Sequence, residues 1–154
     1  MQLFDGPKII TPQLQNEPHF TLDEKGWYPD AGGYSLVRRP SSTDDELFLL
    51  GVLNSKVLWY FIKNTSNPYN NSYYYFKTTY LEPFSLPLCS LGDQKAVSVL
   101  VKRVMALRAD EEEGSKAVRK LEAEIDHLVF KLYGLSTSEI ETIEKASTAP
   151  SNSS

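Results

Sequence analysis

The sequence predicts an α+β protein, with a small β-rich globular part that has a mixed sheet and a core helix, followed by an antiparallel helical hairpin. In the first forty residues, short strand-like runs alternate with Gly and Pro. Further along, apolar residues recur at three- and four-residue spacing, as they do on one face of a helix. We expect a recognition part over residues 1–90, the hairpin over 91–134, a short helix over 135–146 and a disordered tail over 147–154.

The N-terminal part contains the predicted strands, which are short apolar runs between turn-forming residues. They cover residues 8–11, 20–22 and 34–37, with a further short run at Trp27 and Tyr28 after the turn at 23–26. A capping box over 43–46 then precedes a helix from about Asp44 to Lys63. Apolar residues fill most of the circumference of this helix, so we expect it to be packed on more than one side.

The second half carries the signals of paired helices. Helical spacing covers residues 93–107 and 115–133, with the polar run 110–114 as the turn between them. Gly134 is placed to end the second helix, and Ser136 with Glu139 forms a capping box for a short third helix.

Several classes of function are disfavoured by composition. No apolar run approaches the roughly 18 residues that span a bilayer, and there is no signal-peptide pattern, so we expect a cytoplasmic protein without a membrane partner. The single cysteine, Cys89, and two distant histidines predict neither a disulfide nor a metal site. The run Asn67–Pro68–Tyr69 lacks the second proline of the adenine-methyltransferase motif. We therefore expect a recognition and docking module with no catalytic residues.

The distribution of charge matters more than its total. A net charge of −4 argues against a free-standing nucleic-acid binder, because phosphate neutralisation usually supplies the affinity. Between Glu46 and Glu82, however, there is no Asp or Glu, whereas Lys56, Lys63 and Lys77 fall inside this gap. Such a patch can attract an anion within about a Debye length.

The segment from 64 to 80 is the strongest candidate site in the sequence. Its first part is a loop rich in asparagine, including Asn70 and Asn71, and residues 73–80 are the most strand-like of the chain. Amides can read base edges, and rings and lysine can contact bases and phosphates. Alternation along a strand would place Tyr73, Tyr75 and Lys77 outward, while Tyr74 and Phe76 pack on the core.

Arg38 and Arg39 form a second candidate site at the end of the third predicted strand. A guanidinium could clamp a phosphate or read a guanine edge. The alternative, equally supported by the sequence, is a solvated pair that faces Asp44 and Asp45.

The order of several segments resembles the TaqI-like C-terminal specificity domain, the target-recognition domain of type IIG and related restriction-modification adenine methyltransferases. The resemblance covers about residues 8 to 144. The segments that carry it are 8–12, 18–28, 50–59, 74–77, 80–87 and 124–140.

The resemblance implies a division of labour. An upstream methyltransferase domain would bind S-adenosylmethionine and methylate adenine N6, sometimes with a nuclease, while this part recognises double-stranded DNA. The residues that would contact DNA on this view are Lys8, Tyr28, Arg38, Arg39, Lys56, Asn70, Asn71, Tyr73, Tyr75 and Lys77. Asn54 is open to either a structural role or a functional one.

Two other interpretations remain open from the sequence. The first is half of a type I specificity subunit, although its helices are short for a long spacer. The second is a protein-interaction subunit that uses the helical hairpin, which the acidic total favours.

Overall fold

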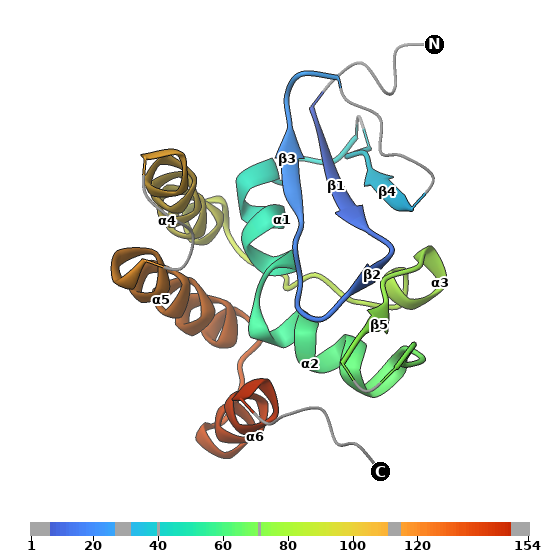
Figure 1. Ribbon diagram of the computed structural model, residues 1–154. Coiled ribbons are helices and arrows are strands. Elements are labelled where there is room, and N and C mark those ends of the chain that lie inside the picture. Colours follow the sequence, from blue (N-terminus) through green and yellow to red (C-terminus); the bar gives the residue numbers. More distant parts are fainter. Residues whose placement is uncertain (1–6, 27–31, 40, 71, 111–114, 149–154) are drawn as a thin grey trace.

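The computed structural model describes residues 7–26, 32–39, 41–70, 72–110 and 115–148. Two small sheets lie on one side of the molecule, two consecutive helices run through its middle, and three further helices cover the other side (Figure 1). This arrangement confirms the predicted α+β class.

All strand pairs of the described residues are antiparallel. The three-stranded sheet has β1 (Lys8–Pro12) in the centre, between β3 (Thr21–Asp23) and β4 (Gly33–Leu36). The second sheet pairs β2 (Leu14–Gln15) with β5 (Tyr74–Tyr75). The short chain between β1 and β2 thus connects the first sheet to the tyrosine-rich segment, a connection that the sequence did not indicate.

The expected helix from Asp44 to Lys63 is two helices, α1 (Glu46–Leu53) and α2 (Lys56–Thr65). Asp45 is the N-terminal cap of α1, since its carboxylate accepts hydrogen bonds from two backbone amides, so the predicted cap at Thr43 is wrong. The chain breaks at Asn54, and the Ser55 side chain caps α2 by accepting a hydrogen bond from Leu58 N at 3.4 Å. Asn54 is structural, since its amide donates to Phe20 O and accepts from Phe20 N, at 2.9 and 2.8 Å.

The predicted strand over 73–80 is also only partly correct. After β5 the backbone amide of Phe76 still donates to Gln13 O at 2.8 Å, but residues from Thr78 form the short helix α3 (Thr78–Leu81). Because the Phe76 side chain is fully buried, the chain turns into the core at this point and leaves the sheet.

The helical hairpin is confirmed as α4 (Leu91–Asp110) and α5 (Lys116–Leu132), which lie side by side in Figure 1. Gly134, with φ of +65°, ends α5 as predicted. The amide of Leu135 donates to Phe130 O and that of Gly134 to Lys131 O, which is a Schellman motif. The capping box is confirmed as well, because Ser136 N donates to the Glu139 carboxylate and Glu139 N to Ser136 Oγ.

The third helix, α6 (Thr137–Thr148), is longer than expected. Ser147 and Thr148 were expected in a disordered tail but are helical. Ser147 Oγ donates to Ile143 O at 2.9 Å, and Lys63 Nζ on α2 donates to Ala146 O at 2.7 Å. These contacts hold the last turn of α6 against α2.

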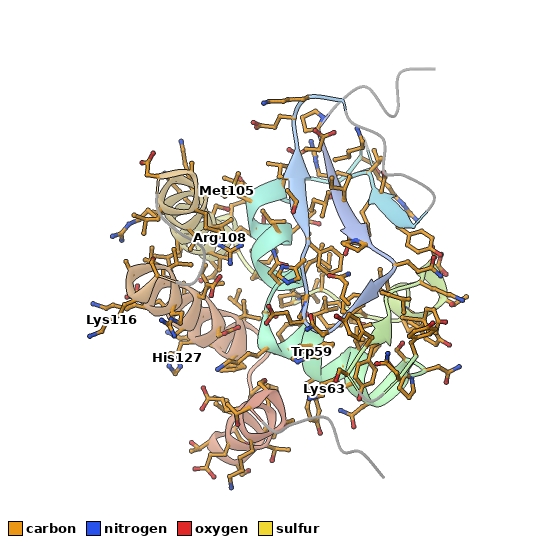
Figure 2. All side chains as sticks on the ribbon, in the orientation of Figure 1. Trp59, Lys63, Met105, Arg108, Lys116 and His127 are labelled. Atoms are coloured by element: carbon orange, nitrogen blue, oxygen red, sulfur yellow. The ribbon has the colours of Figure 1, made fainter. Side chains whose placement is uncertain are left out.

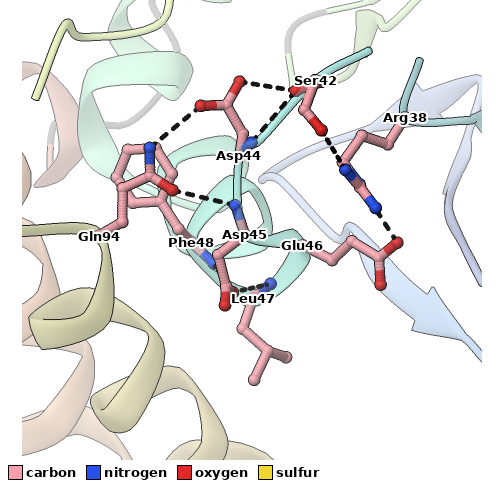
Figure 3. Close-up of polar contacts among 8 residues, drawn as sticks. All are labelled: Arg38, Ser42, Asp44, Asp45, Glu46, Leu47, Phe48 and Gln94. Atoms are coloured by element: carbon pink, nitrogen blue, oxygen red, sulfur yellow. Dashed lines mark hydrogen bonds and ion pairs between the residues drawn. The ribbon is translucent and has the colours of Figure 1, made fainter. Parts of the chain in front are cut away.

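The core is shared by the recognition part and the hairpin. Gly51 of α1 faces Val97 and Val101 of α4 and Ile125 of α5, so that α1 is covered by both hairpin helices. A polar network fixes the same contact at the start of α1 (Figure 3). There Gln94 of α4 accepts from Asp45 N and donates to the Asp44 carboxylate, both at 3.0 Å.

Candidate nucleic-acid interface

The loop between α2 and β5, residues 66–73, is held at both ends by hydrogen bonds. At its base, buried Ser66 donates through Oγ to Tyr75 O at 2.6 Å. Nearer the tip, the Tyr69 amide donates to Tyr73 O at 2.8 Å. These hydrogen bonds hold the loop in place on the core. Loops held by a rigid scaffold often carry binding residues.

Asn70 shapes the tip of this loop. Its side-chain oxygen accepts hydrogen bonds from Ser72 N at 3.1 Å and from Tyr73 N at 3.2 Å. Asn70 is exposed, and both of these hydrogen bonds use its side-chain oxygen, so that within the described part of the chain its amide nitrogen is left as a donor. One end of the side chain thus fixes the turn, and the donor end is open to a ligand.

Side chains of the loop and of the residues that follow it form a cluster. The Tyr69 and Tyr75 rings meet edge to face, with centroids 5.9 Å apart. The ammonium of Lys77 lies over the Tyr75 ring, 4.4 Å from its centroid. Tyr69 and Tyr73 are 59% and 41% exposed, so their rings are available to contact a partner. We call Tyr69, Asn70, Tyr73, Tyr75 and Lys77 the tyrosine cluster.

The alternate residues of this segment face the core, as the sequence predicted. The Tyr74 ring meets the Trp59 ring edge to face at 5.4 Å, and the Phe76 ring stacks on Trp59 at 6.1 Å. Lys63 Nζ also lies over the Trp59 ring, 5.2 Å from its centroid (Figure 2). Burial lowers the pKa of Lys63. The outward tyrosines therefore lie on a segment whose alternate side chains, Tyr74 and Phe76, pack against the Trp59 ring.

Two of the lysines predicted to bind DNA are engaged elsewhere. Lys8 is not the exposed cation that we expected: its side chain is fully buried, and its ammonium pairs with Asp23 at 2.9 Å. The antiparallel register of β1 and β3 places these two residues opposite each other. Lys56 is about one-third exposed and lies 3.9 Å from the Glu144 carboxylate of α6.

The two arginines differ in their surroundings. Arg38 donates to the backbone oxygen of Ser42 and lies 3.7 Å from the Glu46 carboxylate (Figure 3). Its partner is thus Glu46, and not the aspartates that the sequence suggested. Arg39 is exposed.

The structure brings together four of the ten predicted residues, Asn70, Tyr73, Tyr75 and Lys77. Arg38, Arg39 and Lys8 belong to the three-stranded sheet and the segment that follows it, and not to the loop and strand that carry the tyrosine cluster. Tyr28 and Asn71 lie outside the described residues. Tyr69 was missed by the sequence analysis, although its position beside the asparagines in an acid-free segment was a usable signal.

Asp126 is a buried carboxylate that the sequence analysis did not select. It lines a cavity of about 620 Å³ between residues 17–22 and the hairpin helices. Arg108 and Met105 of α4 lie on one wall and Trp59 on another (Figure 2). Charges at this cavity pair with each other, as Arg108 does with Glu122, so it offers no single sign of charge to a ligand.

The described residues contain neither a metal-binding cluster nor a membrane-spanning helix. None of the groups of His, Cys, Asp and Glu that they contain is arranged to hold a metal ion. No helix among them combines the length and apolar character needed to cross a membrane.

Comparison with known proteins identifies the family. Residues 1–88 match the TaqI-like C-terminal specificity domain, which is more than half of the chain, so the chain belongs to this family. The resemblance noted in the sequence is thereby confirmed, and the chain is a specificity domain of the restriction-modification methyltransferase type.

Two relatives place the domain in larger proteins. The type II methyltransferase M.BanIII of Aneurinibacillus aneurinilyticus is 32% identical over 79 residues, which are 51% of this chain and 13% of that protein. The solved structure of the type IIL restriction-modification enzyme MmeI in complex with DNA matches with a TM-score of 0.67 at 15% identity, over 94% of this chain and 22% of that one. The fold is therefore shared across nearly the whole chain, and the matched residues make up less than a quarter of either relative.

Proposed function

We propose that this chain recognises a sequence in double-stranded DNA on behalf of an adenine-specific methyltransferase, and that it has no catalytic role of its own. The observation that carries the proposal is the tyrosine cluster, in which exposed rings, an open amide donor and a lysine occur together. The segment around them, from 47 to 81, contains no Asp or Glu. Membership in a specificity-domain family and a fold shared with a DNA-bound enzyme support the same assignment.

The members of the tyrosine cluster have separate tasks in this proposal. Lys77 binds a phosphate and gives affinity for any duplex, because phosphates carry no base identity. The open amide nitrogen of Asn70 and the exposed ring of Tyr73 contact base edges in a groove and give selectivity. Arg39 is a further cation for flanking phosphates, whereas Arg38 and Lys56 are already paired with carboxylates and Lys8 is buried.

The rest of the parent protein would bind S-adenosylmethionine and transfer the methyl group to adenine N6. A base inside a duplex cannot be methylated until it is turned out of the stack, which costs a few kcal/mol. The recognition domain contributes by holding the duplex beside the target base. The net charge of −4 fits this division, because most of the phosphate contacts would come from the other part. The isolated chain should therefore bind DNA weakly.

The test measures affinity and base preference separately. Duplexes selected from a random library with the isolated chain give the preferred sequence, and fluorescence anisotropy at several salt concentrations gives the affinities. We expect Lys77→Ala to weaken binding to all duplexes by a similar factor and to lower the salt slope by about 1. Tyr73→Ala should instead relax the preference at one base position, at a cost of about 1–3 kcal/mol for the preferred sequence.

A matched control is Lys116→Ala, which removes an exposed lysine from α5, where its side chain points away from the body of the molecule (Figure 2). This variant should keep the wild-type affinity and preference. The proposal is wrong if Lys77→Ala and Lys116→Ala have equal effects, or if binding does not depend on salt. Salt-insensitive binding to a protein would instead favour the interaction subunit.

A further inference from the structure

An exposed aliphatic segment lies in the connection between α3 and α4. Leu86, Leu88 and Leu91 are 41%, 100% and 69% exposed. Single exposed leucines are common on protein surfaces, but three large exposed aliphatic side chains within six residues are an unusual concentration of apolar surface. We call Leu86, Leu88 and Leu91 the leucine face.

The leucine face continues into a cavity of about 300 Å³, because Leu86 forms part of its wall. The other walls come from the three-stranded sheet and from α1 and α3. Their aliphatic and aromatic members are Ile9, Leu22, Leu36, Val37, Leu49, Leu53, Leu81 and Phe84. Arg38 and Glu46, which pair with each other, also line it. The cavity is thus mainly apolar, with polar groups that are already satisfied, and it suits aliphatic side chains better than a charged ligand.

The direction of the chain indicates what covers this region. Pro7, the first described residue, lines the cavity, so any polypeptide that precedes it joins the domain there. The family is described as a C-terminal specificity domain, and the matched region is 13% of one relative and 22% of another. Where a longer polypeptide precedes a C-terminal domain of this kind, it is joined beside the cavity.

We infer that the leucine face and the adjoining cavity are the docking surface for the preceding part of a longer polypeptide, whose aliphatic side chains cover Leu88 and Leu91 and enter the cavity. This rests on the proposed function, in which the catalytic part precedes the recognition domain. Figure 1 places the loop after α2 apart from the segment that joins α3 to α4. A partner on the leucine face therefore leaves the tyrosine cluster open to DNA.

The test compares backbone hydrogen exchange in the isolated chain and in the parent polypeptide as it is encoded, with the residues that precede this domain. We expect peptides from residues 84–92 to exchange about tenfold more slowly in the parent, because docking suppresses local opening. Peptides from residues 64–70 should exchange at the same rate in both. Equal exchange of 84–92 in the two proteins, or a parent that has no preceding domain, would overturn the inference.

Variants separate docking from folding. The double change Leu88→Asp and Leu91→Asp places charges on exposed positions, so the isolated chain should keep its thermal midpoint, while residues 84–92 of the parent should lose their protection. Val99→Asp, at a half-exposed position on α4, is the matched control and should leave that protection in place. If the isolated chain dimerises and the double variant is monomeric, with no added protection in the parent, the surface binds a second copy and the inference fails.

The two proposals fail in different ways. The double variant of the isolated chain should retain the base preference and salt dependence of the wild type, because neither leucine belongs to the tyrosine cluster. Loss of protection in the parent with unchanged DNA preference supports docking at the leucine face. Full protection with no base preference would contradict the proposed function alone.

Discussion

The carboxylate of Asp126 on α5 accepts a hydrogen bond from the backbone amide of Lys56, at 2.9 Å, across 70 residues of sequence. Lys56 is the first residue of α2, so the carboxylate satisfies one of the amides that a helix leaves open at its start. A negative charge is also favoured at this end of a helix. The contact ties the hairpin to the recognition part and takes a carboxylate out of water to do so.

This contact should make the stability of the fold depend on pH. Burial raises the pKa of Asp126 to about 6, against the opposing effects of the hydrogen bond from Lys56 and its charge, and the nearby carboxylates of Glu122 and Glu144 raise it further. Because the folded-state pKa is above the unfolded one, the protonated side chain favours folding. Its contribution is full below pH 4 and is lost as the pH rises through about 6. The change is roughly 2–3 kcal/mol.

Asp126→Asn tests this directly, because it keeps an oxygen acceptor for Lys56 N and cannot ionise. We expect the variant to be more stable than the wild type at pH 8 by roughly 2–3 kcal/mol, and the difference to shrink towards pH 4. Urea unfolding across this range measures it. Glu124→Gln, at an exposed position of the same helix, should give a profile parallel to the wild type. A parallel profile for Asp126→Asn as well would show that Asp126 does not ionise abnormally.

Gly51 should not tolerate a side chain. A Cβ at this position would lie 2.8 Å from Val97 Cγ1 and 2.9 Å from Val101 Cγ2, and both valines are buried and branched at Cβ, with little freedom to move away. We expect Gly51→Ala to destabilise the fold by about 1–3 kcal/mol through overpacking, in spite of the better helix propensity of alanine.

Gly92 provides the control for this prediction. It lies in α4, and a Cβ there would meet only Ser90 Oγ, at 3.7 Å. Gly92→Ala should therefore be neutral or stabilising by up to about 1 kcal/mol. Equal unfolding midpoints for the two variants in a denaturant series would show that α1 and α4 are not as closely packed as described.

Features of the chain that depend on local sequence could be predicted. The hairpin helices, the stop at Gly134 and the capping box at Ser136 each depend on residues within one or two turns. The break at Asn54 could not be predicted, because apolar residues continue at helical spacing through it. The cause is a pair of hydrogen bonds with Phe20, which is 34 residues away.

The same difference between local and long-range causes explains which predicted site residues lie together. Alternation alone separated Tyr75 and Lys77 from Phe76, and the structure agrees. Lys8 was misassigned because its pairing with Asp23 follows from the register of two strands, which the sequence does not fix. Charge patterns can thus locate a candidate surface, but long-range pairing decides which charges remain on it.

The recognition part should not fold without the hairpin, although the family match ends at residue 88. A chain that ends at residue 90 would lose Val97, Val101 and Ile125, which cover Gly51 on α1. We expect such a chain to lack a cooperative unfolding transition and to expose apolar surface, as judged by near-ultraviolet circular dichroism and dye binding.

A chain that ends at residue 134 is the comparison for this truncation. It removes α6, whose buried apolar residue is Ile143, and keeps both hairpin helices. This chain should retain a cooperative transition with a lower midpoint. A cooperative transition in the chain that ends at residue 90 would mean that the sheets and α1 to α3 are an independent folding unit.

Asn70 offers a way to separate the shape of the loop from recognition by it. Its side-chain oxygen accepts from Ser72 N and Tyr73 N, and an aspartate can accept both bonds. Asn70→Asp should therefore preserve the turn, with the amide chemical shifts of neighbouring loop residues showing similar hydrogen bonding. The new carboxylate, however, removes the amide donor and repels phosphates, so duplex binding should fall by about tenfold or more at low salt.

Asn70→Ala removes the acceptor too, and should lose both the turn and the binding. If Asn70→Asp binds DNA as the wild type does, the loop does not approach the duplex through this residue, and Asn70 acts only on loop shape.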